Sequence, residues 1–280
     1  MARPSANNLK VRILSASALV PPALAAVWFG WPYLPALIAV AAAGMGVEWA
    51  KLASPGASRR ALIARTLIVA VPVAAAVIAA FDAFAALEHA LWIAALGSAL
   101  VAAPMATRGY RATLWAVGGT LYLSLAIVVF LWFAERAAGR ESVLWLLAIV
   151  WGSDIGAYAA GRIFGGPRLA PRLSPNKTWA GFVGGVIVAS MVGAAVAWAM
   201  GAASSFLLPA GLSLAAQAGD LAESVAKRHF AVKDSGNLIP GHGGLLDRLD
   251  SLLAAALILG ALTALASPLP VLWGGLGQVL

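Results

Sequence analysis

Cysteine is absent from the sequence, and charged residues are scarce. The lack of Cys excludes disulfides, thiol nucleophiles and thiolate metal ligands. Asp, Glu, Lys and Arg make up only 11% of the 280 residues, whereas a soluble domain carries roughly 25%. Because 62% of the residues are hydrophobic, most of the chain must face lipid or other apolar helices. The composition therefore predicts an integral membrane protein.

Histidine is also rare, and the few charges are unbalanced. His89, His229 and His242 lie far apart in the sequence, so a zinc site is not expected and a hard cation held by carboxylates is the metal to look for. A net charge of +8 could indicate nucleic-acid binding. However, the Lys and Arg residues lie between apolar segments, as the positive-inside bias of membrane proteins requires. We therefore expect no nucleic-acid partner.

Long apolar runs follow one another along the whole chain. A spanning helix needs about 20 mostly apolar residues. The first run resembles a signal peptide, but it is long and leads directly into another, so we interpret it as a retained span. The sequence thus predicts an all-α, polytopic membrane protein in which residues 1–280 form a single transmembrane domain with about nine helices. The expected spans are 13–31, 33–50, 61–80, 90–107, 113–134, 143–161, 179–200, 205–228 and 251–267.

The distribution of Lys and Arg between the loops predicts the orientation. Basic residues occur at the N-terminus and then in every second loop, including 162–177 and 227–250. The loops between them are acidic, mixed or uncharged. We therefore expect a cytoplasmic N-terminus and a C-terminus outside.

Charge is concentrated late in the chain, and the eighth expected helix carries most of it on one face. A polar cluster between spanning helices is costly and indicates a functional site. An alternative is that ion pairs four residues apart, such as Glu223 with Lys227, merely stabilise the helix end. The polar residues that follow helical spacing are Gln217, Asp220, Glu223, Ser224, Lys227 and Arg228.

A glycine-rich loop follows this helix and leads into the last one. The loop runs from Lys233-Asp234 to Gly243-Gly244, and Asp247, Asp250 and Ser251 then share one face of the next helix. Backbone amides in such loops approach phosphates closely, and a helix N-terminus attracts anions. The loop and its flanking charges therefore indicate an anion site.

A third polar element follows the sixth expected helix. Asp154, which we expect to be buried, Tyr158 and Arg162 are spaced four residues apart, and a basic, turn-rich stretch continues to Lys177. Headgroup attraction is the alternative explanation for its basic residues. The chain has no Gly-Lys dipeptide for a Walker loop and no Gly-x-Ser-x-Gly nucleophile elbow.

Together these residues resemble the phosphatidate cytidylyltransferase family. Four stretches between about 150 and 251, the expected catalytic region, carry the resemblance. Two departures are Ala180, where relatives usually have Glu, and Ala226, where a larger aliphatic residue is usual. The stretches are Asp154-x2-Ala157-Tyr158-x2-Gly161-Arg162-x-Phe164-Gly165, Ser174-Pro175-Asn176-Lys177-Thr178-Trp179, Gln217-x-Gly219-Asp220-Leu221-x-Glu223-Ser224, and the run from Ser224-x2-Lys227-Arg228 through Lys233-Asp234 and His242-Gly243-Gly244 to Asp247-Arg248-x-Asp250.

The resemblance implies a nucleotidyltransferase that condenses CTP with phosphatidic acid to CDP-diacylglycerol and pyrophosphate, using Mg²⁺ or Mn²⁺. Asp220 and Asp247 match the family's metal-binding positions. The catalytic residues implied are Asp220, Lys227, Arg228, Lys233, Asp234, His242, Asp247, Arg248 and Asp250. The substrate-binding residues implied are Asp154, Tyr158, Arg162, Ser174, Asn176, Lys177, Thr178, Glu223, Ser224, Gly243 and Gly244.

We expect the protein in a bacterial inner membrane, surrounded by lipid, with its active site on the cytoplasmic side; a homodimer is an open alternative to a monomer. Two other functions stay open. A transporter or proton relay would use the intramembrane charges Glu48, Asp154, Asp220 and Glu223. Such a protein would have its charges scattered through several helices near the midplane, whereas here they cluster at one side, together with a glycine-rich loop. A related enzyme could act on another lipid phosphate, such as an isoprenoid one, because apolar helices read acyl chains with little sequence signature.

Overall fold

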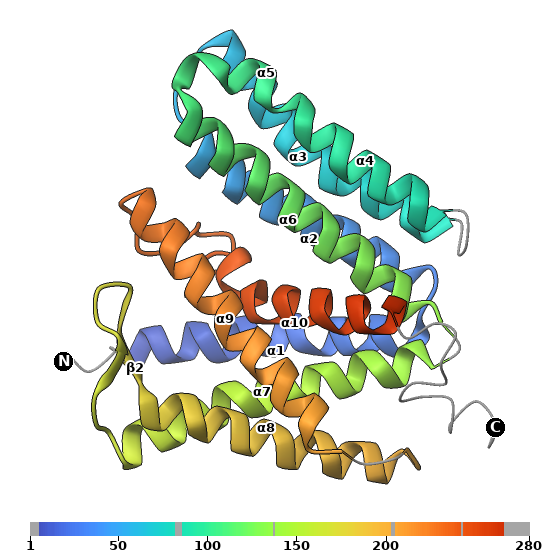
Figure 1. The fold of residues 1–280 in the computed structure, drawn as a ribbon, viewed down its shortest axis with the longest axis vertical. Helices are drawn as coiled ribbons and strands as arrows, with labels where there is room; N and C mark the ends of the chain where they lie inside the picture. The colour runs from blue at the N-terminus through green and yellow to red at the C-terminus, as the bar shows by residue number, and fades with distance from the viewer. Residues whose placement is uncertain (1–5, 82–85, 137, 203–204, 242, 266–280) are drawn as a thin grey trace. The chain divides into compact units, whose positions relative to one another are not determined.

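The computed structural model describes residues 6–81, 86–136, 138–202, 205–241 and 243–265 (Figure 1). Helices account for nearly all of the regular structure, which confirms the all-α prediction. In the described ranges the β structure is a short hairpin and one isolated bridge. The helices are α1 Ala6–Phe29, α2 Tyr33–Ala53, α3 Arg59–Phe81, α4 Ala86–Leu100, α5 Ala102–Met105, the 3-10 helix η1 Ala106–Arg108, α6 Tyr110–Ala134, α7 Gly139–Ile163, α8 Trp179–Ala199, α9 Leu207–His229 and α10 Leu246–Leu265, and the strands are β1 Arg168–Ala170 and β2 Ser174–Thr178.

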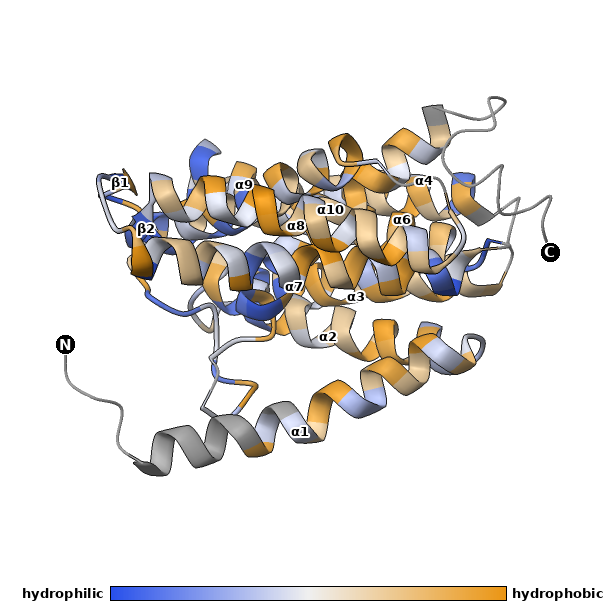
Figure 2. Cartoon of the chain, turned by 90° about the horizontal axis from the view of Figure 1, so that it is seen from below, coloured by the Kyte–Doolittle hydropathy of each residue, from blue (hydrophilic) through white to orange (hydrophobic). Residues whose placement is uncertain are grey.

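Six stretches of the described chain are long and apolar enough to cross a membrane, so this is a polytopic membrane protein. They are α2, α3, the stretch from α4 to η1, α6, α7 and α8, and Figure 2 shows the hydrophobic colours along them. The other expected spans coincide with α1, α9 and α10. Since α9 carries Asp220, Glu223, Lys227 and Arg228, composition alone does not make it a span, and the number nine stays a prediction.

The chain divides into two compact units. The first comprises residues 1–132 and 230–248, and the second comprises residues 133–229 and 249–280. The boundary therefore falls inside α10, between Arg248 and Leu249. The expectation of a single transmembrane domain is not tested by this division.

In the first unit, α2 is central. It packs against α1 and α3, and α3 packs against α4. Buried Trp49 of α2 donates its indole N–H to the carbonyl of Ala116 in α6 at 3.4 Å. Its ring also contacts the rings of Trp115 and Phe230. A Cβ at Gly119 would lie under 3.0 Å from the Trp49 ring, so α6 approaches α2 only because this position is glycine.

In the second unit, α7 packs along α8, and α9 packs against both. Small residues allow the close approach, since a Cβ at Gly156 would lie 2.6 Å from the Val188 Cβ. Polar groups in the interior satisfy one another: the Ser153 and Ser213 hydroxyls lie 2.7 Å apart, and Gln217 donates to the carbonyl of Phe182 at 3.2 Å. Such interhelical hydrogen bonds hold α9 against α7 and α8.

The basic stretch after α7 forms an antiparallel hairpin of β1 and β2. Strand β2 runs directly into α8, where the Thr178 hydroxyl accepts a hydrogen bond from the Gly181 amide at 3.0 Å. This N-cap satisfies one of the unpaired donors of the first turn. The hairpin is thereby fixed at the N-terminus of α8, with Lys177 next to the cap.

Candidate functional site

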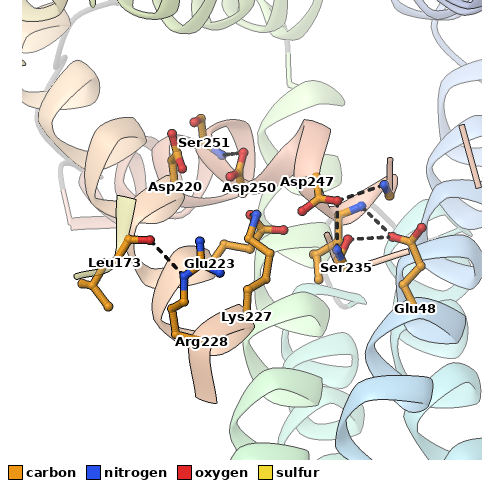
Figure 3. A network of polar contacts seen from close by, with 12 residues as sticks. Glu48, Leu173, Asp220, Glu223, Lys227, Arg228, Ser235, Asp247, Asp250 and Ser251 are labelled. Atoms are coloured by element: carbon orange, nitrogen blue, oxygen red, sulfur yellow. Dashed lines mark hydrogen bonds and ion pairs between the residues drawn. The ribbon is translucent and has the colours of Figure 1, made fainter. Parts of the chain in front are cut away.

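The polar face of α9 is the centre of the candidate site in the second unit. Glu223 and Ser224 are buried, Asp220 and Lys227 are half-buried, and Arg228 is exposed. Lys227 and Glu223 form an ion pair at 2.6 Å, four residues apart. The pair expected from sequence is therefore present, but it accounts for only part of the stripe (Figure 3).

The hairpin is tied to α9 at two points. The Lys177 ammonium in β2 lies 2.6 Å from Asp220 Oδ2, and Arg228 Nε donates to the carbonyl of Leu173 at 3.2 Å. Residues 43 positions apart in sequence thus form an ion pair at the base of the hairpin. Figure 2 shows the hydrophilic colours gathered around β2. The arrangement brings cationic and anionic groups together at one end of the second unit.

A second carboxylate from α10 lies near this pair. Asp250 is 8% exposed and accepts a hydrogen bond from the Ser251 amide at 2.7 Å. The negative charge of Asp220 repels it, and the positive charge of Lys227 attracts it. Acidic groups from two helices are therefore concentrated here, and Lys177 and Lys227 partly neutralise them.

The glycine-rich loop belongs to the first unit and is organised around Asp247. Asp247 Oδ2 accepts hydrogen bonds from the Ser235 amide at 3.0 Å and the Gly244 amide at 2.9 Å. An isolated bridge joins Ile239 to Gly243, whose φ of 86° suits glycine. One carboxylate thus holds both ends of the loop together.

Glu48, an acidic residue of α2, closes the same loop, a role that the sequence did not indicate. Its carboxylate accepts hydrogen bonds from the backbone amides of Leu245 and Leu246 at 3.0 and 2.9 Å. The loop and helix N-terminus that we expected to bind an external anion therefore already hold two protein carboxylates (Figure 3). A carboxylate in a spanning helix was the available signal, but its partner could not be read from the sequence.

The remaining predicted residues have the following surroundings. The expectation that Asp154 is buried is wrong, since Asp154 is exposed. The nearby residues Ser153 and Gly156 of α7 instead contact α9 and α8. Arg162 donates to the Tyr158 hydroxyl at 3.1 Å, as their spacing on one face predicts. Thr178 caps α8, so a substrate role would compete with that bond.

The second unit contains Asp154, Tyr158, Arg162, Ser174, Asn176, Lys177, Thr178, Asp220, Glu223, Ser224, Lys227, Arg228 and Asp250, and the first contains Lys233, Asp234, Gly243, Gly244, Asp247 and Arg248. The side chains of Lys233, Asp234 and Arg248 are exposed. His242 lies outside the described residues. The catalytic and substrate-binding roles of all these residues stay predictions.

The donor groups suit a hard cation in kind, because they are carboxylate oxygens. In the described ranges, no three His, Asp or Glu side chains are placed to enclose a metal ion. Magnesium usually keeps water ligands and takes one or two carboxylates together with substrate phosphates. The residues present therefore fit a cation that takes one or two carboxylates from the protein and completes its ligand set with substrate phosphates.

Comparisons with known proteins identify similar chains over nearly the whole length. A model described as the cytidylyltransferase family matches residues 10–266. The phosphatidate cytidylyltransferase of Brucella suis biovar 1 (strain 1330) is 37% identical over 262 residues, which cover 90% of this chain and 92% of that protein. The protein of the same name from Staphylococcus aureus (strain COL) is 45% identical over 127 residues, covering 44% and 49% of the two chains.

Proposed function

The chain belongs to the cytidylyltransferase family, and we propose that it is a phosphatidate cytidylyltransferase, which makes CDP-diacylglycerol and pyrophosphate from CTP and phosphatidic acid in phospholipid biosynthesis. The observation that carries the proposal is the 37% identity to a protein of that name over 90% of this chain. The polar face of α9 and the glycine-rich loop lie in the part of the sequence that resembles the family.

The reaction needs little general-base help. An oxygen of the lipid phosphate attacks the α-phosphorus of CTP, and the bond from that phosphorus to the bridging oxygen of pyrophosphate breaks. A phosphomonoester has its second pKa near ~6, so its nucleophilic oxygen is largely deprotonated at neutral pH. The main barrier is the repulsion between two polyanions that must be held in line.

The basic residues of the second unit are suited to reduce that repulsion. Lys177, Lys227 and Arg228 each have a partner inside the protein: Asp220, Glu223 and the Leu173 carbonyl. We assign these three cations to phosphate groups of CTP or the lipid. Incoming phosphates would compete with the internal carboxylates, and charge-assisted bonds of this kind are strong enough to do so.

Asp220 and Asp247 are the proposed ligands of Mg²⁺ or Mn²⁺. The bound metal would neutralise phosphate charge as it develops. Asp220 is half-buried and ion-paired with Lys177, so it would give up this partner. Asp247 uses Oδ2 to hold the loop, which fixes the direction of its carboxylate.

The proposed location is a bacterial inner membrane, with the N-terminus and the site facing the cytoplasm and the C-terminus outside. The Lys/Arg distribution between the loops supports this orientation. CTP would arrive from water and phosphatidic acid sideways from the leaflet, among membrane lipids. A homodimer is a further arrangement that purification can examine.

The test is CTP incorporation by the purified protein in detergent micelles. The assay follows labelled CTP into lipid with phosphatidic acid, lysophosphatidic acid and an isoprenoid phosphate as acceptors, and measures pyrophosphate in parallel. We expect one pyrophosphate per lipid nucleotide and a strong preference for phosphatidic acid. Preference for the isoprenoid phosphate would replace the proposed substrate, and no incorporation with any acceptor would overturn the proposal.

A further inference from the structure

Glu48 is a carboxylate in a helix that is otherwise suited to lipid. It lies near the end of α2, a candidate membrane span, and its side chain is only 1% exposed. A buried carboxylate is costly unless the protein supplies donors or opposite charge. The contacts of Glu48 therefore indicate why it is there.

Both oxygens of Glu48 accept hydrogen bonds at the point where the glycine-rich loop leads into α10. Oε1 accepts from the Leu245 amide at 3.0 Å, and Oε2 accepts from the Leu246 amide at 2.9 Å. The Ser235 hydroxyl lies 3.4 Å from Oε2. Leu246 is the first residue of α10 and Leu245 directly precedes it, at a helix end where backbone donors have no partner within the helix. Glu48 thus caps α10 from a position almost 200 residues earlier in the chain.

The loop encloses the carboxylate closely. A Cβ on Gly236 would lie under 3.0 Å from Glu48 Oε1, and a Cβ on Gly244 would lie 2.8 Å from Oε2. Neither glycine has a positive φ, so close packing and not backbone conformation requires glycine at both positions. The crowding at Gly236 comes from Glu48, and the crowding at Gly244 comes from the Ser235 hydroxyl and from Glu48. The two glycines and the carboxylate therefore form one packed unit.

In the part of the chain that the structure describes, the ion pairs join other residues and none involves Glu48. Its negative charge is instead balanced by amide dipoles and the N-terminal end of α10, where a helix favours negative charge. Asp247 lies in that first helical turn and accepts from Ser235 and Gly244. Glu48 and Asp247 consequently hold the same loop from two sides.

We propose that Glu48 is a positioning residue that fixes the loop 235–246 and the first turn of α10, and through them the carboxylate of Asp247. The proposal rests on the proposed function, since Asp247 matters there as a metal ligand. In this role Glu48 acts through the loop and Asp247, and not on substrate. It acts by satisfying adjacent amides that would otherwise be free to reorient.

Glu48→Gln is the decisive variant because Gln has almost the same shape and volume. A carboxamide has one acceptor oxygen and an NH₂ group that only donates. In either orientation of the amide, one of the two backbone N–H groups, of Leu245 or Leu246, must face that NH₂ group. The packing of the side chain is retained, whereas one of its two hydrogen bonds to the backbone N–H groups of Leu245 and Leu246 is lost.

The kinetic experiment compares Glu48→Gln with Glu88→Gln, which changes an exposed carboxylate in the first turn of α4. We expect Glu48→Gln to lower kcat about 10–100-fold, as for loss of one charge-assisted bond, with KM for CTP changed less than threefold. Glu88→Gln should match the wild type. If the wild type is active and Glu48→Gln has the same kcat, the positioning role is overturned. If the wild type itself is inactive, the proposed function is overturned.

A second readout reports the loop directly. The chain has no native cysteine, so a nitroxide can be attached to an Asn237→Cys variant in the loop or to a His89→Cys variant on α4, both exposed positions. Glu48→Gln should increase the mobility of the label at 237 and leave the label at 89 unchanged. Equal changes at both positions, or none at 237, contradict the proposal.

Gly236→Ala keeps the test decisive if Glu48→Gln does not fold. The new methyl group would displace Glu48 Oε1, so we expect a similar loss of kcat and similar label mobility at 237. In a Glu48→Ala background the added methyl group has space, and its further cost should nearly vanish, as non-additive neighbours require. Additive effects of the two substitutions would show that Gly236 and Glu48 act independently.

Discussion

Replacing Lys177 by Ala separates a role in substrate binding from a role in stability. Lys177 lies in β2, and its ammonium pairs with Asp220 Oδ2 at 2.6 Å. The two side chains are 26% and 35% exposed. The substitution removes both the ion pair in the resting protein and the phosphate contact that we propose for the complex with substrate.

The two contributions have different expected sizes. An ion pair with this degree of solvent contact contributes about 0–1 kcal/mol to stability, so the unfolding temperature of Lys177→Ala should change little. A charge-assisted contact to a phosphate contributes about 1.5–3 kcal/mol. At ~1.4 kcal/mol per decade, kcat/KM should fall at least tenfold, and further if the contact tightens in the transition state.

The control is Arg59→Ala. Arg59 begins α3, is exposed, and has no proposed contact with substrate. The assay measures kcat/KM for CTP and for phosphatidic acid at several salt concentrations, with thermal unfolding in the same detergent. We expect Arg59→Ala to keep nearly full activity at every salt concentration.

Two results would refute the reasoning. If Lys177→Ala and Arg59→Ala lose activity equally and added salt reproduces the loss, the basic hairpin only attracts the membrane surface. If Lys177→Ala unfolds at a much lower temperature and keeps its kcat/KM, the Lys177–Asp220 pair is structural. The phosphate contacts would then have to be sought elsewhere, first at Lys233 and Arg248.

Three further outcomes are expected. Asp220→Asn and Asp247→Asn should each abolish turnover while the protein still inserts, and wild-type activity should need Mg²⁺ or Mn²⁺; full activity in EDTA contradicts the metal assignment. An Asn237→Cys variant should react with an impermeant thiol reagent from the cytoplasmic side, and reaction only from the other side would reverse the topology. Burial raises the pKa of Glu135 above its ordinary value, so the charged form is disfavoured in the folded state and stability falls as pH rises through the raised pKa. Glu135→Gln should therefore increase the unfolding temperature at neutral pH and have no effect well below the ordinary carboxyl range, and a gain that persists in acid would show another cause.

The sequence alone determined the class of protein and the positions of its helices. Apolar runs of spanning length coincide with all six candidate spans of the structure, because hydrophobic length is a local property. The polar stripe of α9 was also readable, since helical periodicity places Glu223, Ser224 and Lys227 together whatever the rest of the chain does. The family resemblance to cytidylyltransferases depended on short contiguous motifs, which likewise need no tertiary information.

Only the tertiary structure decided which of these groups are partners. The Lys177–Asp220 pair requires the β1–β2 hairpin to lie against α9, and the capping of α10 by Glu48 joins segments almost 200 residues apart. Hydrophobic patterning predicts that helices pack against one another, but it does not predict at which small residues they approach closely. The positions of close approach determine which polar groups from distant segments become partners. For the same reason the exposure of Asp154 could not be predicted: its spacing gives a helix face, whereas the neighbouring helices decide whether that face is buried.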